Sequence, residues 1–191
     1  MITTDSRATA PAPYVWLRPT AVTASLLLFS YGVLRLLDGL DGYRDKSGWP
    51  WLAGHTLFLL GIVLFAVFMV GLRGRLLATS PRQRVLTDLA TVAGLMGATA
   101  FGWVILGDLF PRFAEAVSTP DLVLIGGPAL FQLGLLTLLV RAAVVRPRLL
   151  PFWAPALVLV GFVAIGVDLD LLPVGAALVF GGLLPVRQPA P

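Results

Sequence analysis

The charged residues of this chain lie almost entirely between long apolar stretches, and their sign alternates from one connection to the next. Arginines fill the connections at residues 73–84 and 141–148, whereas acidic residues fill those at 38–45, 108–121 and 168–170. In membrane proteins, connections rich in lysine and arginine stay on the cytoplasmic side of the bilayer. The alternation therefore predicts that the chain crosses a membrane six times and that both of its ends lie in the cytoplasm.

The apolar stretches are long enough for such crossings, because a hydrocarbon core of about 30 Å needs about 20 apolar residues in a helix. With 13% charged residues and a mean hydropathy of +0.90, the chain has too little polar sequence to cover a water-soluble core. We therefore predict an all-α membrane bundle whose six spans lie at residues 19–37, 49–72, 85–107, 122–145, 151–167 and 170–186.

The last two spans are shorter than the others, at about 17 residues or roughly 25 Å each. Two arrangements are open. We favour two true crossings; the alternative is a re-entrant hairpin in which Asp168 and Asp170 turn inside the protein. The six-helix domain then covers residues 17–186, between a disordered cytoplasmic tail at 1–16 and a short cytoplasmic tail at 187–191.

A pattern of glycine, leucine and phenylalanine in Gly54–Gly61 reappears in Gly127–Gly134 and, more weakly, in Gly175–Gly182. Each occurrence lies in the returning helix of a predicted hairpin. The pattern is therefore consistent with three helical hairpins of the same orientation. Chance similarity is an equally weighted alternative, because small and apolar residues are common in membrane helices.

The third predicted span has a small residue at every fourth position, namely Ala90, Gly94, Ala98 and Gly102. Such a face lets a neighbouring backbone approach closely, which is how helices associate in a bilayer. We expect this face to pack within the chain's own bundle. A homo-oligomer or a contact with another membrane protein is the alternative.

The acidic connections lie next to the only histidine of the chain. His55 is one turn inside the second span, Arg35 and Asp38 end the first span, and Asp108 ends the third. Because the two helices of a hairpin meet at the same depth, we expect these four side chains to converge just below the outer headgroups.

Ionisable side chains at membrane depth are functional candidates by default. His55 could pass protons to Asp38 or Asp108, ligate a metal ion with two carboxylates, or act as a general base. The structural alternative, which we favour, is that His55 and Arg35 only anchor helix ends with their polar tips at the interface. The chain has no His-Glu-x-x-His motif and no paired histidines, so we expect neither a metal ion nor a cofactor.

Gln132 lies near the middle of the fourth span, where an unpaired amide is costly. We expect it to hydrogen-bond a hydroxyl at similar depth, for which Thr99, Ser25 and Ser30 are the candidates. The alternative is a polar path through the bundle, which Thr137 would also line.

The segment VLRLLDGLDG, followed after a short loop by GWPWLAGHTLFLLGIVLF, resembles small multi-pass membrane proteins of high-GC Gram-positive bacteria. In those proteins a leucine-rich first helix ends in an Asp-Gly element, and the second helix begins with Trp-x-x-Gly-His. The resemblance covers roughly residues 30–72. It implies a membrane topology and a recurring Gly54-His55 element, but no activity.

Three functions follow as hypotheses. The leading one is a small accessory or transport-like protein of the plasma membrane whose polar residues gather at the outer ends of the first three spans. The second is a membrane enzyme that acts on a lipid or another apolar molecule through His55 and an aspartate. The third is an interaction protein that associates through the small-residue face. The net charge of +4 is explained by arginines that face anionic headgroups, so we expect the lipid bilayer as the partner and no nucleic acid.

Overall fold

The computed structural model describes residues 14–40, 42, 46, 48–117 and 119–187. Its elements are α1 (Leu17–Asp38), α2 (Trp49–Thr79), the 3-10 turn η1 (Pro81–Gln83), α3 (Arg84–Leu109), α4 (Pro111–Ala116), α5 (Asp121–Val144), α6 (Trp153–Val167), the 3-10 turn η2 (Leu169–Leu171) and α7 (Leu172–Leu183). No strand occurs among the described residues, which confirms the all-α prediction. Most of the two predicted tails, and Asp41 and Asp45 of the first acidic connection, lie outside the described residues.

Four helical segments are long and apolar enough to cross a membrane: α1, α2, the η1–α3 segment and α5. The other two apolar helices are shorter, with 15 residues in α6 and 12 in α7. At 1.5 Å per residue, even α6 spans only about 22 Å, less than the hydrocarbon core of about 30 Å. Six crossings therefore stay a prediction, whereas four are supported by helix length and composition.

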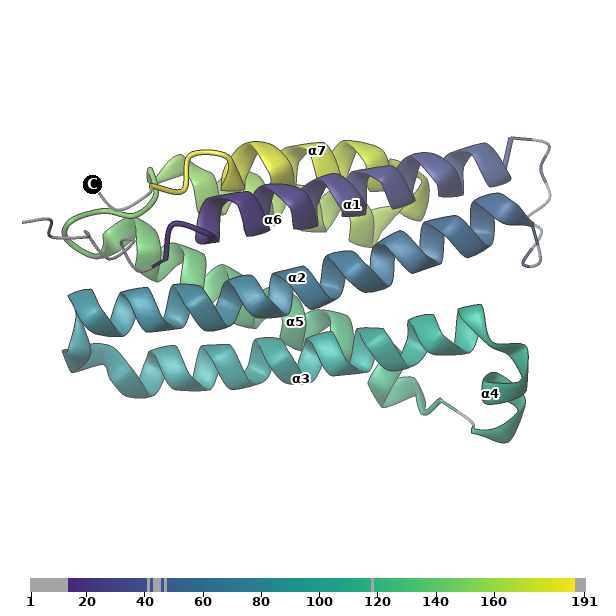
Figure 1. The fold of residues 1–191 in the computed structure, drawn as a ribbon, viewed down its shortest axis with the longest axis horizontal. Coiled ribbons are helices and arrows are strands. Elements are labelled where there is room, and N and C mark those ends of the chain that lie inside the picture. The colour runs from purple at the N-terminus through teal and green to yellow at the C-terminus, as the bar shows by residue number, and fades with distance from the viewer. Residues whose placement is uncertain (1–13, 41, 43–45, 47, 118, 188–191) are drawn as a thin grey trace, which may run out of the picture.

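The helices pair as three hairpins (Figure 1). The most extensive contacts join α1 to α2, α3 to α5 and α6 to α7. Contacts of α1 with α7 and of α2 with α3 join the hairpins into one bundle. The short helix α4, absent from the prediction, lies in the α3–α5 connection, where its Phe113 packs edge-to-face on Trp103 with the ring centroids 5.0 Å apart.

The repeated glycines lie at the contact between the two helices of each hairpin. A Cβ atom at Gly61 would lie 3.4 Å from a backbone carbonyl oxygen of α1. At Gly134 it would lie 2.5 Å from the carbonyl oxygen of Ala90 in α3, and at Gly175 2.5 Å from that of Gly161 in α6. The repeat thus marks the helix that returns in every hairpin.

The small-residue stripe of α3 turns from one neighbouring helix to another. Ala90 contacts α5, and Gly94 lies between Met69 of α2 and Gly134 of α5. Ala98 and Gly102 line a groove beside α2. A step of four residues advances about 40° around a helix, because one turn holds 3.6 residues. The contact with α5 is continued instead by Gly97, where a Cβ atom would lie 2.6 Å from a backbone carbonyl oxygen of α5.

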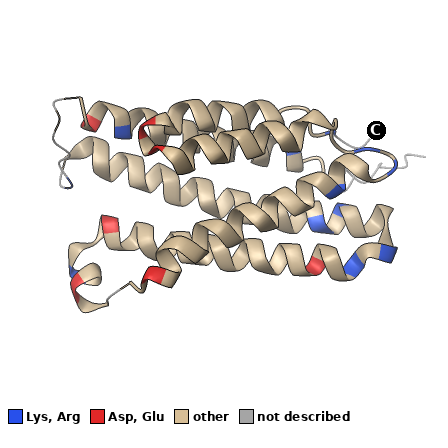
Figure 2. Ribbon diagram, turned by 180° about the vertical axis from the view of Figure 1, so that it is seen from behind, with Lys and Arg blue, Asp and Glu red and all other residues tan. Residues whose placement is uncertain are grey.

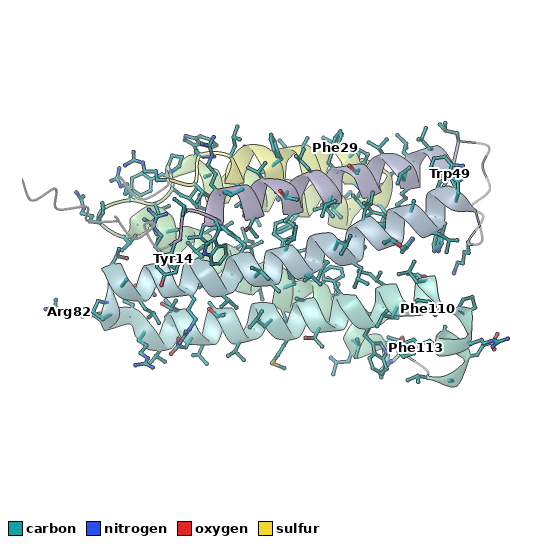
Figure 3. The ribbon with its side chains drawn as sticks, viewed as in Figure 1. Tyr14, Phe29, Trp49, Arg82, Phe110 and Phe113 are labelled. Atoms are coloured by element: carbon teal, nitrogen blue, oxygen red, sulfur yellow. The ribbon has the colours of Figure 1, made fainter. Side chains whose placement is uncertain are left out.

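Charged residues gather at the two ends of the bundle (Figure 2). The arginine-rich end holds the α2–α3 connection, the C-terminal end of α5 and the end of α7; the acidic end holds the last turn of α1, α4 and η2. Figure 3 shows Trp49, Phe110 and Phe113 at the acidic end and Tyr14 at the other. The outer surface between the two ends is apolar and includes at least half-exposed Leu60, Val92, Leu133 and Val163, as a surface that contacts lipid requires.

The third hairpin stops below the acidic end of α1. A Cβ atom at Gly32 of α1 would lie 2.8 Å from the backbone nitrogen of Pro173, near the start of α7. Gly32 precedes the last residue of α1, Asp38, by six residues, or about 9 Å along the helix. The α6–α7 hairpin therefore leaves the last turns of the other helices uncovered on one side.

Candidate functional site

A cavity of about 480 Å³ lies in the space above the short third hairpin. Residues of α1, α2, α3, α5 and α6 form its walls, and Leu169 of η2 and Leu172 of α7 close it toward the third hairpin. The end of α6 and the turn that leads into α7 form one side of the cavity. Its size and its mainly apolar lining are typical of a site for a small molecule.

Phenylalanines form the inner part of the cavity. Phe131 of α5 is central, since its ring makes edge-to-face contacts with Phe65, Phe101 and Phe162, with ring centroids 5.9, 5.5 and 6.3 Å away. Phe58 extends the cluster by a similar contact with Phe101 at 5.5 Å. Aromatic rings favour edge-to-face contacts at such centroid distances, and these contacts hold the rings in place. The inner wall of the cavity is therefore a rigid, apolar surface.

His55 lies at the other side of the cavity and is almost fully buried, with 3% of its surface exposed. Its Nδ1 is 2.9 Å from the carbonyl oxygen of Trp51, one turn earlier in α2. A carbonyl oxygen only accepts hydrogen bonds, so Nδ1 carries the proton and donates it. In the neutral ring Nε2 is therefore unprotonated and is an acceptor.

Asp108 faces this acceptor. Its Oδ2 is 3.6 Å from His55 Nε2, and both groups line the cavity. The indole Nε1 of Trp51 donates a hydrogen bond of 3.1 Å to the backbone carbonyl of Asp108, which ties the end of α3 to the start of α2. Two acceptors thus point at each other across a gap that a proton, or the N–H or O–H group of a ligand, would bridge.

Aromatic rings hold the imidazole in place. The ring of Trp51 lies against it with a centroid distance of 4.1 Å, and the ring of Tyr31 in α1 meets it edge-on at 5.1 Å. Tyr31 is itself stacked on Phe58 at 4.5 Å. Trp51 and Tyr31 were not among the predicted site residues, although the i, i+4 spacing of Trp51 and His55 on one helix face is a signal that could have identified Trp51.

Four side chains were predicted to converge near the outer headgroups, and three of them line this one cavity: Arg35, His55 and Asp108. Asp38 is near the end of α1 but does not line the cavity. The Arg35 Nε and the Asp38 Oδ2 are both buried and make no hydrogen bond to a described residue. Arg35 therefore adds a positive charge to the cavity lining, and its Nε–H is free to donate a hydrogen bond.

Gln132 of α5 also lines the cavity, away from any hydrogen-bond partner among the described residues. Two of the hydroxyls expected to pair with it are bonded within their own helices: Ser25 donates to Ala21 at 2.8 Å and Thr99 to Leu95 at 3.0 Å. Thr137 does the same toward Leu133 and does not line the cavity. The amide is thus a second polar group that a bound molecule could meet.

Within the described residues, no three histidine, aspartate or glutamate side chains come together in a way that could hold a metal ion. Comparison of the chain with protein families, with curated proteins and with solved structures finds no match. Functional inference therefore rests on the geometry of the cavity.

Proposed function

We propose that the chain is an integral membrane protein of the plasma membrane that binds a small, mainly apolar molecule in the cavity at its acidic end, in an accessory or transport-like role. The positive-inside rule supports an orientation in which the arginine-rich end is cytoplasmic and the cavity lies toward the outer face. The observation that carries this proposal is that one cavity contains both the His55–Asp108 pair and Gln132.

The polar groups of the cavity specify what the ligand must offer. His55 Nε2 and Asp108 Oδ2 are acceptors 3.6 Å apart, so they favour a ligand with an O–H or N–H group, or a proton taken up together with the ligand. The phenylalanine cluster favours an aromatic or aliphatic body. A molecule with one donor group on an apolar ring or chain satisfies both.

The enzyme alternative receives less support from the same geometry. A histidine that acts as a general base is usually oriented by a carboxylate on the nitrogen opposite the reacting one. Here a backbone carbonyl bonds Nδ1, and the carboxylate of Asp108 faces Nε2, the nitrogen that would have to receive the substrate proton. This arrangement is better suited to binding a proton, or the N–H or O–H group of a ligand, than to removing a proton from a substrate.

A continuous path across the bundle is also not favoured, because the cavity ends at the phenylalanine cluster and Thr137 lies outside it. An interaction through the small-residue face receives less support, since Ala90 is packed against α5 and Gly94 against Met69 of α2 and Gly134 of α5. The transport-like function that remains is that of a binding protein. Such a protein would transfer its ligand to a partner or change its conformation when the ligand binds.

Two matched probes test this proposal. 2-Naphthol has an apolar ring system and one O–H donor, and naphthalene is the same ring system without the donor. With the purified protein in detergent micelles, we expect 2-naphthol to bind about tenfold more tightly, as one hydrogen bond to a well-placed acceptor contributes about 1 kcal/mol or more. His55→Ala should abolish this preference without loss of expression, whereas Thr56→Val should keep it, because the Thr56 hydroxyl is exposed and bonds Leu52.

Equal binding of the two probes to the wild-type protein would contradict the role of the His55–Asp108 pair. Absence of any binding of either probe, in a protein that retains its helix content, would contradict the cavity as a binding site. Loss of expression of His55→Ala alone would support the anchoring role of His55.

A further inference from the structure

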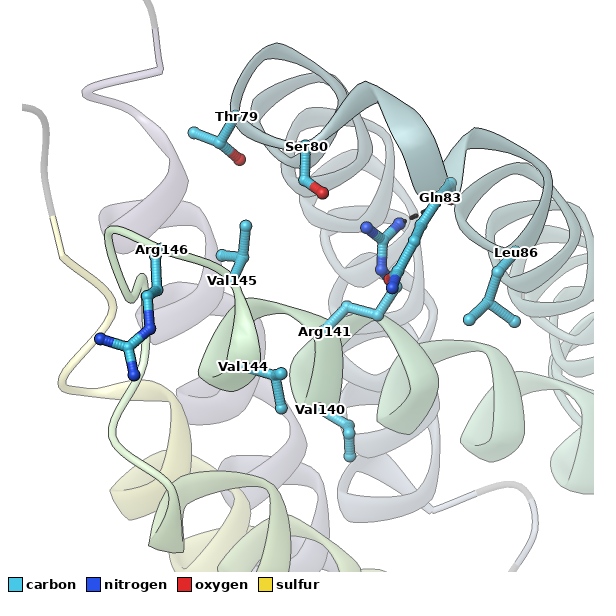
Figure 4. A pocket seen from close by; sticks show the side chains of 9 residues that line it. All are labelled: Thr79, Ser80, Gln83, Leu86, Val140, Arg141, Val144, Val145 and Arg146. Atoms are coloured by element: carbon cyan, nitrogen blue, oxygen red, sulfur yellow. Dashed lines mark hydrogen bonds between the residues drawn. The ribbon is translucent and has the colours of Figure 1, made fainter.

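A second cavity, of about 430 Å³, lies at the arginine-rich end, at the opposite end of the bundle from the first. It is bounded by the α2–α3 connection on one side and by the C-terminal end of α5 on the other (Figure 4). Thr79, Ser80 and Gln83 come from the connection, and Arg141 and Arg146 from α5 and the residues after it. The cavity is unrelated to the function proposed above.

Arg141 is the notable side chain of this cavity. Only 6% of its surface is exposed, and its guanidinium lies between the α2–α3 connection and α5 (Figure 4). Its Nη1 donates one hydrogen bond of 2.9 Å to the backbone carbonyl of Gln83. A guanidinium has five N–H groups, and no other hydrogen bond of Arg141 to the described residues occurs.

Among the described residues, no carboxylate pairs with the Arg141 guanidinium. Asp88 is the only acidic residue at the arginine-rich end among the described residues. It is already bound by Arg73 at 2.7 Å and by Arg84 at 3.4 Å. A buried cation without an anionic partner is costly to a fold, so an anion in this cavity would stabilise Arg141.

Three other arginines at this end make contacts of a different kind. Arg18 donates to the carbonyl of Leu184 at 3.1 Å, and Arg75 donates to that of Arg187. The guanidinium of Arg148 lies 3.9 Å from the centroid of the Phe152 ring, a cation–π contact. They tie the chain together at its surface, whereas Arg141 is buried at a cavity wall.

We propose that this cavity binds the phosphate group of an anionic ligand, with Arg141 as the main donor. The guanidinium presents N–H groups in the fork that matches a phosphate. The Ser80 hydroxyl lines the same cavity and has no hydrogen bond to a described residue, so it offers a further donor. Exposed Arg146 stands at the edge of the cavity and adds positive charge.

The apolar part of the lining favours a lipid phosphate over a free one. Leu86, Val140 and Val144 complete the cavity, and all three are also exposed on the outside of the bundle. A phosphate at Arg141 would thus have apolar surface beside it on which acyl chains can lie. Basic pockets between membrane helices bind anionic headgroups in this way.

The test compares phosphatidylglycerol, phosphatidylcholine and inorganic phosphate as ligands of the full-length protein in a non-ionic detergent. Native mass spectrometry measures the dissociation constants. The wild-type protein should bind phosphatidylglycerol at least tenfold more tightly than phosphatidylcholine, whose choline group neutralises its phosphate. Inorganic phosphate should compete weakly; if it binds as tightly as the lipid, the same site serves a free phosphate.

Arg141→Gln should weaken phosphatidylglycerol binding about tenfold, which corresponds to about 1.4 kcal/mol. Arg148→Gln, with the same change of charge at the same end, should have little effect. Arg141→Lys should be intermediate, because it keeps the charge but loses the fork, and it tests the site even if Arg141→Gln fails to fold. Equal effects of Arg141→Lys and Arg148→Gln, or no preference of the wild-type protein for phosphatidylglycerol, would overturn the proposal.

Discussion

At Gly97, one added methyl group should disturb the contact between α3 and α5. Its Cβ position would fall on the backbone of Phe131 and 2.6 Å from the carbonyl oxygen of Gly127. Both obstacles are backbone atoms of α5, so they cannot move aside by a change of rotamer. Gly97→Ala therefore forces α3 and α5 apart.

Gly102→Ala, five residues further along the same helix, is the matched control. The Cβ atom there would meet only a methyl carbon of Leu59, at an ordinary contact distance of 3.9 Å. Both changes gain the higher helix propensity of alanine, about 1 kcal/mol, so this gain cancels in the comparison. The difference that remains is the cost of overpacking, about 1–3 kcal/mol.

Unfolding in mixed micelles with increasing SDS, followed by far-UV circular dichroism, measures this difference. We expect Gly97→Ala to unfold at a clearly lower SDS fraction than Gly102→Ala. Because Phe131 is central to the phenylalanine cluster, Gly97→Ala should also weaken 2-naphthol binding. If the two variants were equally stable, the close α3–α5 approach would be refuted.

Two further substitutions test the acidic end. Trp51→Phe removes the hydrogen bond to the Asp108 carbonyl and should lower the free energy of unfolding by about 0.5–1.5 kcal/mol. A thermal melt should show this loss. An unchanged melting temperature would argue against the hydrogen bond as a link between α2 and α3. Asp168→Ala removes the carboxylate that accepts from the Asp170 backbone N–H at 2.8 Å and should cost about 0.5–2 kcal/mol. Asp168→Asn should retain most of that stability, and equal losses in both variants would show that charge rather than capping matters there.

The apolar segments and the charges between them predicted the long helices and the two polar ends but not the short helix α4. An apolar segment of about 20 residues can satisfy its backbone in a bilayer only as a helix. The predicted ends of the helices were less accurate than the predicted helices themselves. α2 continues past the predicted end at residue 72 to Thr79, since Leu76 near its end is fully buried. The predicted hairpins appear in the structure, and the repeated glycines Gly134 and Gly175 lie where the partner backbone leaves no room for a Cβ atom.

The composition of the candidate site could be predicted only in part. Depth along each helix identified Arg35, His55 and Asp108, because depth follows from sequence position alone. The cavity that joins them to Gln132 depends on where the short α6–α7 hairpin packs against Gly32, which is a tertiary property. For the same reason the sequence placed Asp38 with the other three residues, whereas it lies outside the cavity lining.

Gly97 illustrates another limit of pattern reading. The stripe at every fourth position correctly identifies α3 as a closely packed helix, but a straight stripe rotates around the helix and meets two neighbours in turn. Only the position of α5 shows that Gly97 continues the contact. The same reasoning applies to Arg141, which topology alone explains as a cytoplasmic arginine and which the structure shows to be buried at a cavity.

The central claim, that His55 offers an unprotonated Nε2 to the cavity beside Asp108, is tested most directly by nitrogen NMR. The chain has one histidine, so protein labelled with ¹⁵N-histidine and purified without a histidine tag gives a single imidazole. We predict that the neutral ring is protonated at Nδ1, that 2-naphthol but not naphthalene shifts the Nε2 resonance, and that Asp108→Asn also shifts this resonance because it replaces the group that faces Nε2. A neutral ring protonated at Nε2, with a resonance that neither the probe nor Asp108→Asn changes, would contradict it.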